Sequence, residues 1–330
     1  MSEFISTFIT GFQDIVQKDL SEKLEGCKIL DISDGLVHYK YDRNSRDLEK
    51  IVYFNNTFFV LQTFRKNEDF AAMVKAVCSQ KNYYLISKGT FRIRFQKENQ
   101  FEKADKNLVK RAEETVIANS KLKPDRVSPS TEIWYSKRRD GFGFCGQLIS
   151  KREFTEKNLH KGELRPETAY LICCFASLQG NETVLEPFSG YGGIAVQLVK
   201  KFKFDTLFIS DIEKEKIDYL SEKKQFAGNE KTHLSVQDAF VLENIKDNSI
   251  DCIITDPPWG FYEEIENIND FYERMFASFR RVLKQNGYMV ILTARKNEFE
   301  QVCSKNNIKI TQSLHTLVNG KKAGLFRVCF

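Results

Sequence analysis

The run TVLEPFSGYGG at residues 183–193 decides the fold. Its first four residues have the pattern of a short apolar strand, and Gly190, Gly192 and Gly193 follow directly. Downstream, short apolar runs alternate with segments of helical periodicity, which is typical of strands and helices alternating along the chain. The pattern predicts an open, doubly wound, mostly parallel α/β sheet that starts with Thr183–Glu186.

The remaining strands of this sheet can be read from the same alternation. They are expected at Thr206–Ser210, Leu234–Val236, Ile250–Thr255, Met289–Thr293, and in a closing antiparallel pair, Ile308–Leu314 and Gly324–Cys329. In such folds ligands bind at the carboxyl ends of the strands, where strand order reverses. Acidic residues follow three successive strands, as Glu186, Asp211 and Asp238. These acids predict a ligand site at that edge.

Each of these positions has a chemical use. Gly190 and Gly192 remove side chains where a ligand approaches the backbone, and the next helix offers its positive N-terminus to a carboxylate. Asp211 is suited to accept two ribose hydroxyls, Asp238 an adenine amine, and Glu186 a cationic amino-acid head group. The loop also fits the dinucleotide fingerprint, so a nicotinamide-dependent oxidoreductase is an alternative at this step.

The motif Asp256-Pro257-Pro258-Trp259, after the fourth strand, favours a different chemistry. An exocyclic amine on a base is a poor nucleophile because its lone pair is delocalised. The Asp256 carboxylate and a backbone carbonyl of the proline turn offer two acceptors for its N–H groups, and they are preorganised because proline fixes φ. Trp259 offers a stacking surface for an extruded base. The motif therefore indicates methylation of a base amine.

The positive charge is concentrated in the middle of the chain. The net charge is +5, and residues 51–155 hold 20 basic and 11 acidic side chains, against 7 and 10 in residues 1–50 and 23 and 24 in residues 156–330. This distribution favours a module that binds a polyanion, with a solvated lysine-rich surface as the alternative.

Local patterns place several of these cations. Thr90–Gln96 alternates as a strand with Arg92 and Arg94 on its open face. A hairpin is expected around Lys137-Arg138-Arg139-Asp140-Gly141, because Asp-Gly is a strong turn signal.

Two further local patterns concern secondary structure in the first part of the chain. Ile29–Tyr41 is expected to be a strand, and Asn67 is expected to cap a helix.

Composition sets further bounds. The 330 residues are 42% hydrophobic, and no apolar run approaches the about 18 residues of a membrane span. The first ten residues lack the basic lead of a signal peptide, so a cytoplasmic protein is expected. The eight cysteines are scattered without a C-x-x-C pair, so no metal site is expected.

Residues 183–293 resemble the class I methyltransferases that methylate amines, which have a Rossmann-like seven-stranded sheet. Glu186–Gly192 matches their first motif and Asp256–Trp259 their catalytic motif. The stretch His160–Pro166 looks like the segment before the catalytic domain in THUMP-containing RNA methyltransferases. The resemblance thus extends over nearly the whole chain.

The resemblance implies three domains: ferredoxin-like at residues 1–62, THUMP-like and RNA-binding at 63–153, and methyltransferase at 154–330. It implies S-adenosylmethionine as cofactor and N2-methylation of guanosine in tRNA, with ribosomal RNA as the substrate of some relatives and a small activating protein needed by others. The implied cofactor-binding residues are Glu186, Phe188, Gly190, Gly192, Asp211, Ile212, Asp238, Ala239 and Asp256. The implied catalytic residues are Asp256, Pro257, Pro258 and Trp259, and the candidate RNA contacts are Arg92, Arg94, Lys137, Arg138, Arg139 and Arg165.

Three positions depart from the family pattern. Tyr191 stands where many relatives have a small residue, and Glu186 replaces a common aspartate. Trp259 replaces the usual tyrosine or phenylalanine and recurs in some adenine-N6 methyltransferases. Adenine-N6 methylation therefore remains an alternative, and a non-catalytic RNA-binding or assembly protein is an alternative of another class.

Overall fold

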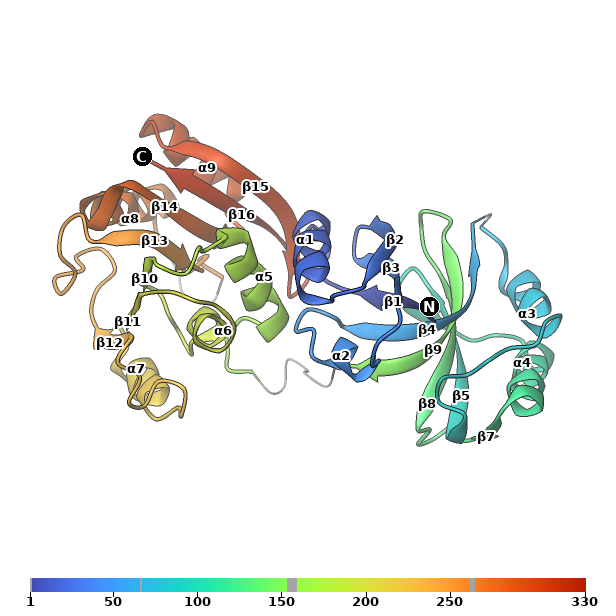
Figure 1. Ribbon diagram of the computed structural model, residues 1–330. Coiled ribbons are helices and arrows are strands. Elements are labelled where there is room, and N and C mark those ends of the chain that lie inside the picture. Colours follow the sequence, from blue (N-terminus) through green and yellow to red (C-terminus); the bar gives the residue numbers. More distant parts are fainter. Residues whose placement is uncertain (1, 66, 153–158, 262–264) are drawn as a thin grey trace. The chain divides into compact units, whose positions relative to one another are not determined.

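The computed structural model describes residues 2–65, 67–152, 159–261 and 265–330. The chain divides into two compact units, one of Met1–Phe8 and Leu20–Glu153 and one of Ile9–Asp19 and Phe154–Phe330. Helix α1 (Gln13–Lys23) belongs to both, since its first seven residues fall in the second unit and the rest in the first. Each unit has its own sheet (Figure 1).

The first unit is built on a nine-stranded sheet in the order β2-β3-β1-β4-β9-β8-β5-β6, with β7 also paired to β5. Its elements are β1 (Ser2–Thr7), β2 (Lys28–Ser33), β3 (Leu36–Tyr41), α2 (Arg46–Glu49), β4 (Asn56–Phe64), α3 (Phe70–Cys78), β5 (Lys88–Lys97), β6 (Gln100–Glu102), α4 (Lys106–Asn119), β7 (Lys121–Pro124), β8 (Thr131–Lys137) and β9 (Gly143–Lys151). The sheet runs through both predicted N-terminal domains, so the boundary at residue 62 stays a prediction.

Helices α3 and α4 cover one face of β5 and β8 (Figure 1). Met73, Val74 and Val77 of α3 are buried at helical spacing, and they share a core with Ala112 and Val116 of α4. This leaves the arginine-bearing side of β5 uncovered by these two helices.

Two sequence expectations in this unit are wrong. Asp69, not Asn67, caps α3, because its side chain accepts the Ala72 N–H at 2.7 Å while Asn67 lies outside the helix at φ +50°. The segment Ile29–Tyr41 is a hairpin of β2 and β3 rather than one strand, because Gly35 adopts φ +78° and reverses the chain.

The second unit contains a seven-stranded sheet in the order β12-β11-β10-β13-β14-β16-β15 (Figure 1). Its elements are α5 (Pro166–Ala176), β10 (Thr183–Glu186), α6 (Gly193–Lys201), β11 (Thr206–Asp211), α7 (Lys214–Ser221), β12 (Thr232–Val236), β13 (Ile250–Thr255), α8 (Ile268–Val282), β14 (Leu283–Thr293), α9 (Lys296–Lys305), β15 (Lys309–Val318) and β16 (Lys321–Cys329). β10 to β14 are mutually parallel, and β16 is antiparallel to β14 and β15. The predicted doubly wound, mostly parallel α/β sheet is confirmed.

Strand order reverses between β10 and β13, because the chain leaves β10 toward β11 on one side and returns as β13 on the other. The carboxyl ends of these two strands therefore border the crevice where this fold class binds ligands. The β13–β14 side of the sheet packs on a core shared with α8 and α9, which includes Ile253, Phe279 and Phe299.

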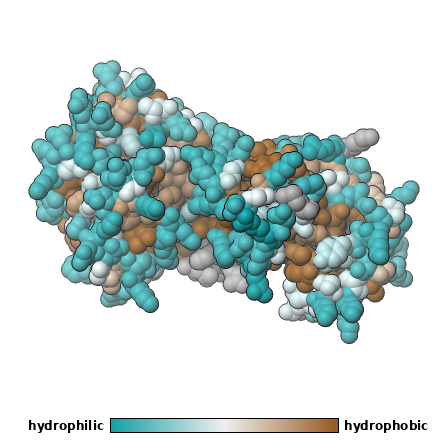
Figure 2. Space-filling view, in the orientation of Figure 1, coloured by the Kyte–Doolittle hydropathy of each residue, from teal (hydrophilic) through white to brown (hydrophobic). Residues whose placement is uncertain are grey.

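Hydrophilic side chains dominate the surface in view, with smaller hydrophobic areas between them (Figure 2). Over the described ranges, the helices are all too short or too polar to cross a lipid bilayer.

Candidate functional site

A cavity of about 510 Å³ opens at the carboxyl ends of β10, β11 and β13. It is lined by all but one of the residues that the sequence predicts for cofactor binding and catalysis. Those that line it are Glu186, Phe188, Gly190, Asp211, Ile212, Asp238, Ala239, Asp256, Pro257, Pro258 and Trp259. The exception is Gly192. The tertiary structure thus brings together residues from Glu186 to Trp259, up to 73 positions apart in sequence.

The glycines of the loop after β10 have three different roles. Gly190 has φ +52°, and a Cβ there would meet nothing within 4 Å. Gly192 has φ +84°, and a Cβ there would lie 2.4 Å from Cδ2 of Leu220, so this glycine makes room for α7. A Cβ on Gly193 would lie 3.2 Å from Cβ of Leu164, so the third glycine lets the segment before α5 pass close to the start of α6.

Asp211 and Asp238 are held in place by backbone donors. Asp211 is 6% exposed, and its two carboxylate oxygens accept the N–H groups of Gly190 at 2.8 Å and Glu213 at 3.0 Å. Asp238 accepts the N–H of Phe240 at 2.8 Å. Each carboxylate oxygen has more than one lone pair, so both side chains are oriented and still available to accept hydrogen bonds from a ligand.

Glu186 presents an unsatisfied acceptor to the cavity. It is 1% exposed, and its Oε2 is buried without a hydrogen-bond partner among the described residues. Burial raises its pKa well above the ordinary value, and the carboxylates of Asp211 and Asp256 raise it further, against a backbone hydrogen bond from Ala195. An unpaired buried carboxylate is costly, so the site fits a ligand that brings a cation or a donor here.

Asp256 presents the second unsatisfied acceptor. Its Oδ1 is buried and, within the described ranges, has no hydrogen-bond partner. Burial raises the pKa of this carboxyl to about 8, and the nearby indole N–H of Trp259 opposes the shift. Because β10 and β13 are neighbours in the sheet, the two carboxyl groups with orphaned oxygens line the same cavity.

The turn that carries Asp256 is fastened to the end of β14. The indole N–H of Trp259 donates to the Leu292 carbonyl at 3.3 Å, and Nε of Arg295 donates to the Trp259 carbonyl at 2.9 Å. Phe261 packs edge to face against the indole at 6.2 Å between ring centres. These contacts fix the orientation of the flat indole at the cavity wall.

A comparison with known families decides the class of this site. The RMKL-like methyltransferase domain matches residues 152–322, which is more than half of the chain. The chain belongs to this methyltransferase family. The expectation of a class I methyltransferase is thereby confirmed, and the oxidoreductase alternative is excluded.

Among curated proteins, the chain is 28% identical over 147 residues to the tRNA (guanine(10)-N2)-dimethyltransferase of Methanothermobacter thermautotrophicus, with 42% of this chain and 43% of the relative aligned. The chain thus matches less than half the length of that relative. Among solved structures it resembles TrmN from Thermus thermophilus (TM-score 0.80, 18% identity, 99% of both chains) and a possible methylase from Clostridium difficile 630 (TM-score 0.74, 17% identity, 99% and 97%). At these identities the structural likeness establishes the fold.

The methyltransferase domain fits S-adenosylmethionine at this cavity. The orphaned carboxylate oxygen of Glu186 suits the cationic head group of this cofactor, and that of Asp256 suits a polar group of the substrate that reacts with it. The open space at Gly190 admits a ligand close to the backbone, and the start of α6 offers its positive N-terminus to a carboxylate. Within the described residues, no group of three or more His, Cys, Asp or Glu side chains is arranged to hold a metal ion.

An aromatic stack missed in the sequence borders this site. The ring of His160 stacks on Tyr191 at 3.9 Å and 12°, and Tyr219 meets both rings edge on. Tyr191, noted in the sequence only as a bulky departure, thereby holds the segment before α5 beside the glycine loop of the methyltransferase domain. Lys161 to Leu164 of that segment line the cavity.

The tip of the β15–β16 hairpin is a second contribution that the sequence did not predict. Val318, Asn319 and Lys321 line the cavity, although they follow the catalytic motif by about 60 residues. The only local signal was the dipeptide Asn319-Gly320, which forms the turn with φ values of +49° and +77°.

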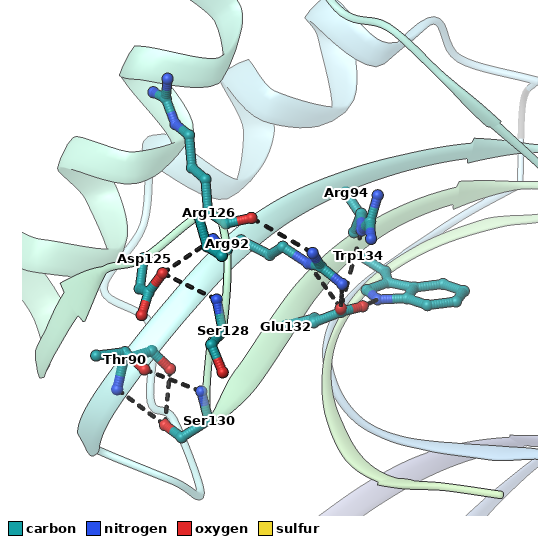
Figure 3. Close-up of polar contacts among 10 residues, drawn as sticks. Thr90, Arg92, Arg94, Asp125, Arg126, Ser128, Ser130, Glu132 and Trp134 are labelled. Atoms are coloured by element: carbon teal, nitrogen blue, oxygen red, sulfur yellow. Dashed lines mark hydrogen bonds and ion pairs between the residues drawn. The ribbon is translucent and has the colours of Figure 1, made fainter. Parts of the chain in front are cut away.

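The predicted RNA contacts on β5 lie in an ion-pair cluster (Figure 3). Nε of Arg92 donates to Oε1 of Glu132 at 2.7 Å, and Nε of Arg94 lies 3.8 Å from the same oxygen. Oε2 of Glu132 accepts the indole N–H of Trp134 at 2.6 Å. Glu132 is 7% exposed, so it fixes both arginines at the surface and offsets part of their charge.

The other predicted cations have different surroundings. Arg138 donates to the Asp34 carbonyl at 2.6 Å and pairs with Asp140 at 3.2 Å, while Arg139 is exposed at the hairpin tip. Nζ of Lys137 lies 5.7 Å from the centre of the Phe70 ring. In the second unit, Arg165 lies 3.9 Å from the buried Glu167 carboxylate, just before α5.

Proposed function

We propose that this methyltransferase transfers a methyl group from S-adenosylmethionine to the exocyclic N2 amine of a guanosine in tRNA. The observation that carries the proposal is the buried Oδ1 of Asp256, which has no partner among the residues that the structure describes and lies in one cavity with Glu186 and the oriented indole of Trp259. The substrate follows from the curated relative, whose name is tRNA (guanine(10)-N2)-dimethyltransferase.

The residues that would hold the cofactor follow from their positions. Glu186 would accept hydrogen bonds from the ammonium of the amino-acid part, Asp211 from the ribose hydroxyls and Asp238 from the adenine amine, with the first turn of α6 near the carboxylate. Phe188, Ile212 and Ala239 would supply apolar contacts beside these groups. S-adenosylmethionine, when bound, supplies an electrophilic methyl group on a cationic sulfur.

The catalytic turn would act on the attacking amine. Asp256 accepts one N–H of the amine and the backbone carbonyl of Pro257 accepts the other, which favours a tetrahedral nitrogen and stabilises the positive charge that develops on it. Pro258 keeps the turn rigid. Trp259 stacks on the extruded base and holds the nitrogen in line with the methyl group.

We assign the first unit to holding the RNA. The middle segment carries the positive excess of the chain, and Arg92, Arg94, Lys137, Arg138 and Arg139 lie on β5 and at the β8–β9 turn. Arg165, at the start of α5 in the second unit, would contact RNA from the methyltransferase domain itself. The ferredoxin-like and THUMP-like assignments of residues 1–62 and 63–153 belong to this proposal, as does a cytoplasmic location.

The test is incubation of the protein with unmodified total tRNA and methyl-labelled S-adenosylmethionine, followed by nucleoside mass spectrometry. N2-methylguanosine is the expected product, and N6-methyladenosine would instead support the alternative raised by Trp259. Asp256→Ala should lower kcat by about 100-fold or more while cofactor affinity stays within a few-fold. Near-normal turnover of that variant would refute the role of Asp256.

A further inference from the structure

The aromatic stack beside the glycine loop joins three elements of the second unit. The ring centres of His160 and Tyr191 are 3.9 Å apart, and Tyr219 of α7 meets these rings edge on at 4.9 and 5.3 Å. Tyr219 is itself held by Lys223, whose Nζ donates to the Tyr219 hydroxyl at 3.0 Å. Stacked and edge-to-face pairs stabilise beyond the area that they bury, so these contacts fix the segment before α5 against the glycine loop and α7.

His160 also begins a tight turn that continues into the cavity wall. Its N–H donates to Oε2 of Glu163 at 3.0 Å, and the N–H of Glu163 donates to the His160 carbonyl at 3.1 Å. Gly162 lies between them with φ +81°. Because these two hydrogen bonds close the turn, residues 160–163 are expected to move together, and the position of the His160 ring fixes that of the turn.

The other end of this segment is held at the start of α6. Leu164 is buried, and its backbone passes so close to Gly193 that a Cβ there would lie 3.3 Å from the Leu164 carbonyl oxygen. Residues 161–164 are therefore held at both ends, by the His160–Tyr191 stack and by this approach. All four line the cavity, whereas His160 is not among the described residues that line it.

Residues 161–164 lie near the part of the cavity that would hold the amino-acid end of the cofactor. The proposed function assigns the start of α6 to the carboxylate of this end and Glu186 to its ammonium, and Gly193 and Glu186 line the cavity with residues 161–164. S-adenosylmethionine and the product S-adenosylhomocysteine share this end and differ at the sulfur. A change in residues 161–164 would therefore act on both ligands alike.

We infer that the His160–Tyr191 stack raises the affinity for the cofactor by holding residues 161–164 in the binding position before the ligand arrives. Without the stack, the ligand itself has to order this segment, and ordering a segment on binding lowers the affinity. His160 is thus a positioning residue that acts through Tyr191. This inference goes beyond the proposed RNA substrate and rests only on the placement of S-adenosylmethionine in the cavity.

The experiment is calorimetric titration of the full chain with S-adenosylmethionine and, separately, with S-adenosylhomocysteine. His160→Ala should weaken both ligands by the same factor, about twofold to tenfold, which is the range for one aromatic pair. His160→Phe keeps a flat ring against Tyr191 and should restore most of the affinity. In a Tyr191→Leu background, His160→Ala should cause no further loss, because the stack is already absent.

His233→Ala is the matched control. His233 also stacks on an aromatic ring of the same domain, that of Phe208, at 5.1 Å between ring centres, and it is not among the described residues that line the cavity. This variant should bind both ligands as wild type does.

Amide hydrogen exchange without ligand separates positioning from a general loss of stability. In His160→Ala, exchange should become faster in residues 160–164 and stay as in wild type in β10, β11 and β13, and the cofactor should restore protection. Faster exchange throughout these strands would overturn the inference, as would unchanged affinity in His160→Ala or a loss that His160→Phe does not recover. If wild type bound neither ligand, the cofactor assignment of the proposed function would fall, and this inference with it.

Discussion

Glu186 ends β10, Asp256 directly follows the neighbouring parallel strand β13, and both line one cavity, each with a buried carboxylate oxygen that has no hydrogen-bond partner among the described residues. Burial raises the pKa of both carboxyl groups, so both are costly to ionise in this cavity. A cationic ligand would reduce this cost, because it stabilises the ionised carboxylates.

The first prediction concerns the ammonium contact of Glu186. Glu186→Gln should weaken S-adenosylmethionine binding about tenfold to a hundredfold, because a hydrogen bond to a charged group is replaced by one to a neutral amide. Calorimetric titration measures the affinity. Asp218→Asn, an exposed position on α7 outside the cavity, is the control and should bind as wild type. Equal affinity of the Gln variant and wild type would remove Glu186 from the cofactor site.

The second prediction follows from the pKa of Asp256. The folded protein holds this proton up to a pH of about 8, whereas the unfolded chain releases it near 3.8. The raised pKa therefore makes wild-type stability fall as pH rises between these values. Asp256→Asn lacks this loss, so its Tm without cofactor should exceed that of wild type by an amount that grows from pH 4 to pH 8.

The same pKa governs activity, because only the ionised carboxylate accepts the amine N–H. The kcat/KM of wild type should rise with pH toward about 8, the pKa of the free enzyme. Thermal melts and rates over this pH range test both statements. A difference in Tm that stays constant with pH would show that Asp256 does not titrate in this way.

The third prediction separates two glycines of one loop. Gly192→Ala should destabilise the fold by about 2–4 kcal/mol, because alanine is strained at φ +84° and its Cβ would lie 2.4 Å from Cδ2 of Leu220. Gly190→Ala should cost only about 1–2 kcal/mol, since its φ is +52° and the space around it is open.

The loss of cofactor affinity should have the opposite order, with Gly190→Ala losing more affinity than Gly192→Ala. Gly190 lines the cavity, so a methyl group there obstructs the ligand, and Gly192 does not line it. Denaturant unfolding and titration with S-adenosylmethionine provide the two measurements. Gly190→Ala with full affinity would mean that the ligand does not approach the loop at this residue.

The fourth prediction concerns Arg139, the exposed cation at the β8–β9 turn. Arg139→Ala should weaken tRNA binding and lower the slope of log affinity against log salt by about 1, as expected for one phosphate contact. Lys110→Ala on the exposed side of α4 serves as the control. An unchanged salt slope in Arg139→Ala would place the RNA elsewhere.

Arg92 is a poorer choice for such a test. Its removal leaves the buried Glu132 with less compensation, so a loss of binding would be mixed with a loss of stability. The sequence could not distinguish these cases, because the carboxylate that holds Arg92 comes from β8, 40 residues away.

The sequence by itself determined the type of sheet and the edge at which the cavity lies. Strand ends at Glu186, Asp211 and Asp256 could be located because short apolar strands, glycines and prolines are local signals. In a doubly wound sheet the carboxyl ends of parallel strands meet at one edge, so locating these strands was enough to collect the acids in one site.

Only the tertiary structure decided which distant elements complete that site. The stack of His160 on Tyr191 and the approach of Lys321 to Phe261 join segments without any shared local pattern. Gly192 follows the same rule, since a Cβ at this position would collide with Leu220 on another helix. Side-chain packing between elements is non-local, and for that reason a single sequence carries no direct signal of it.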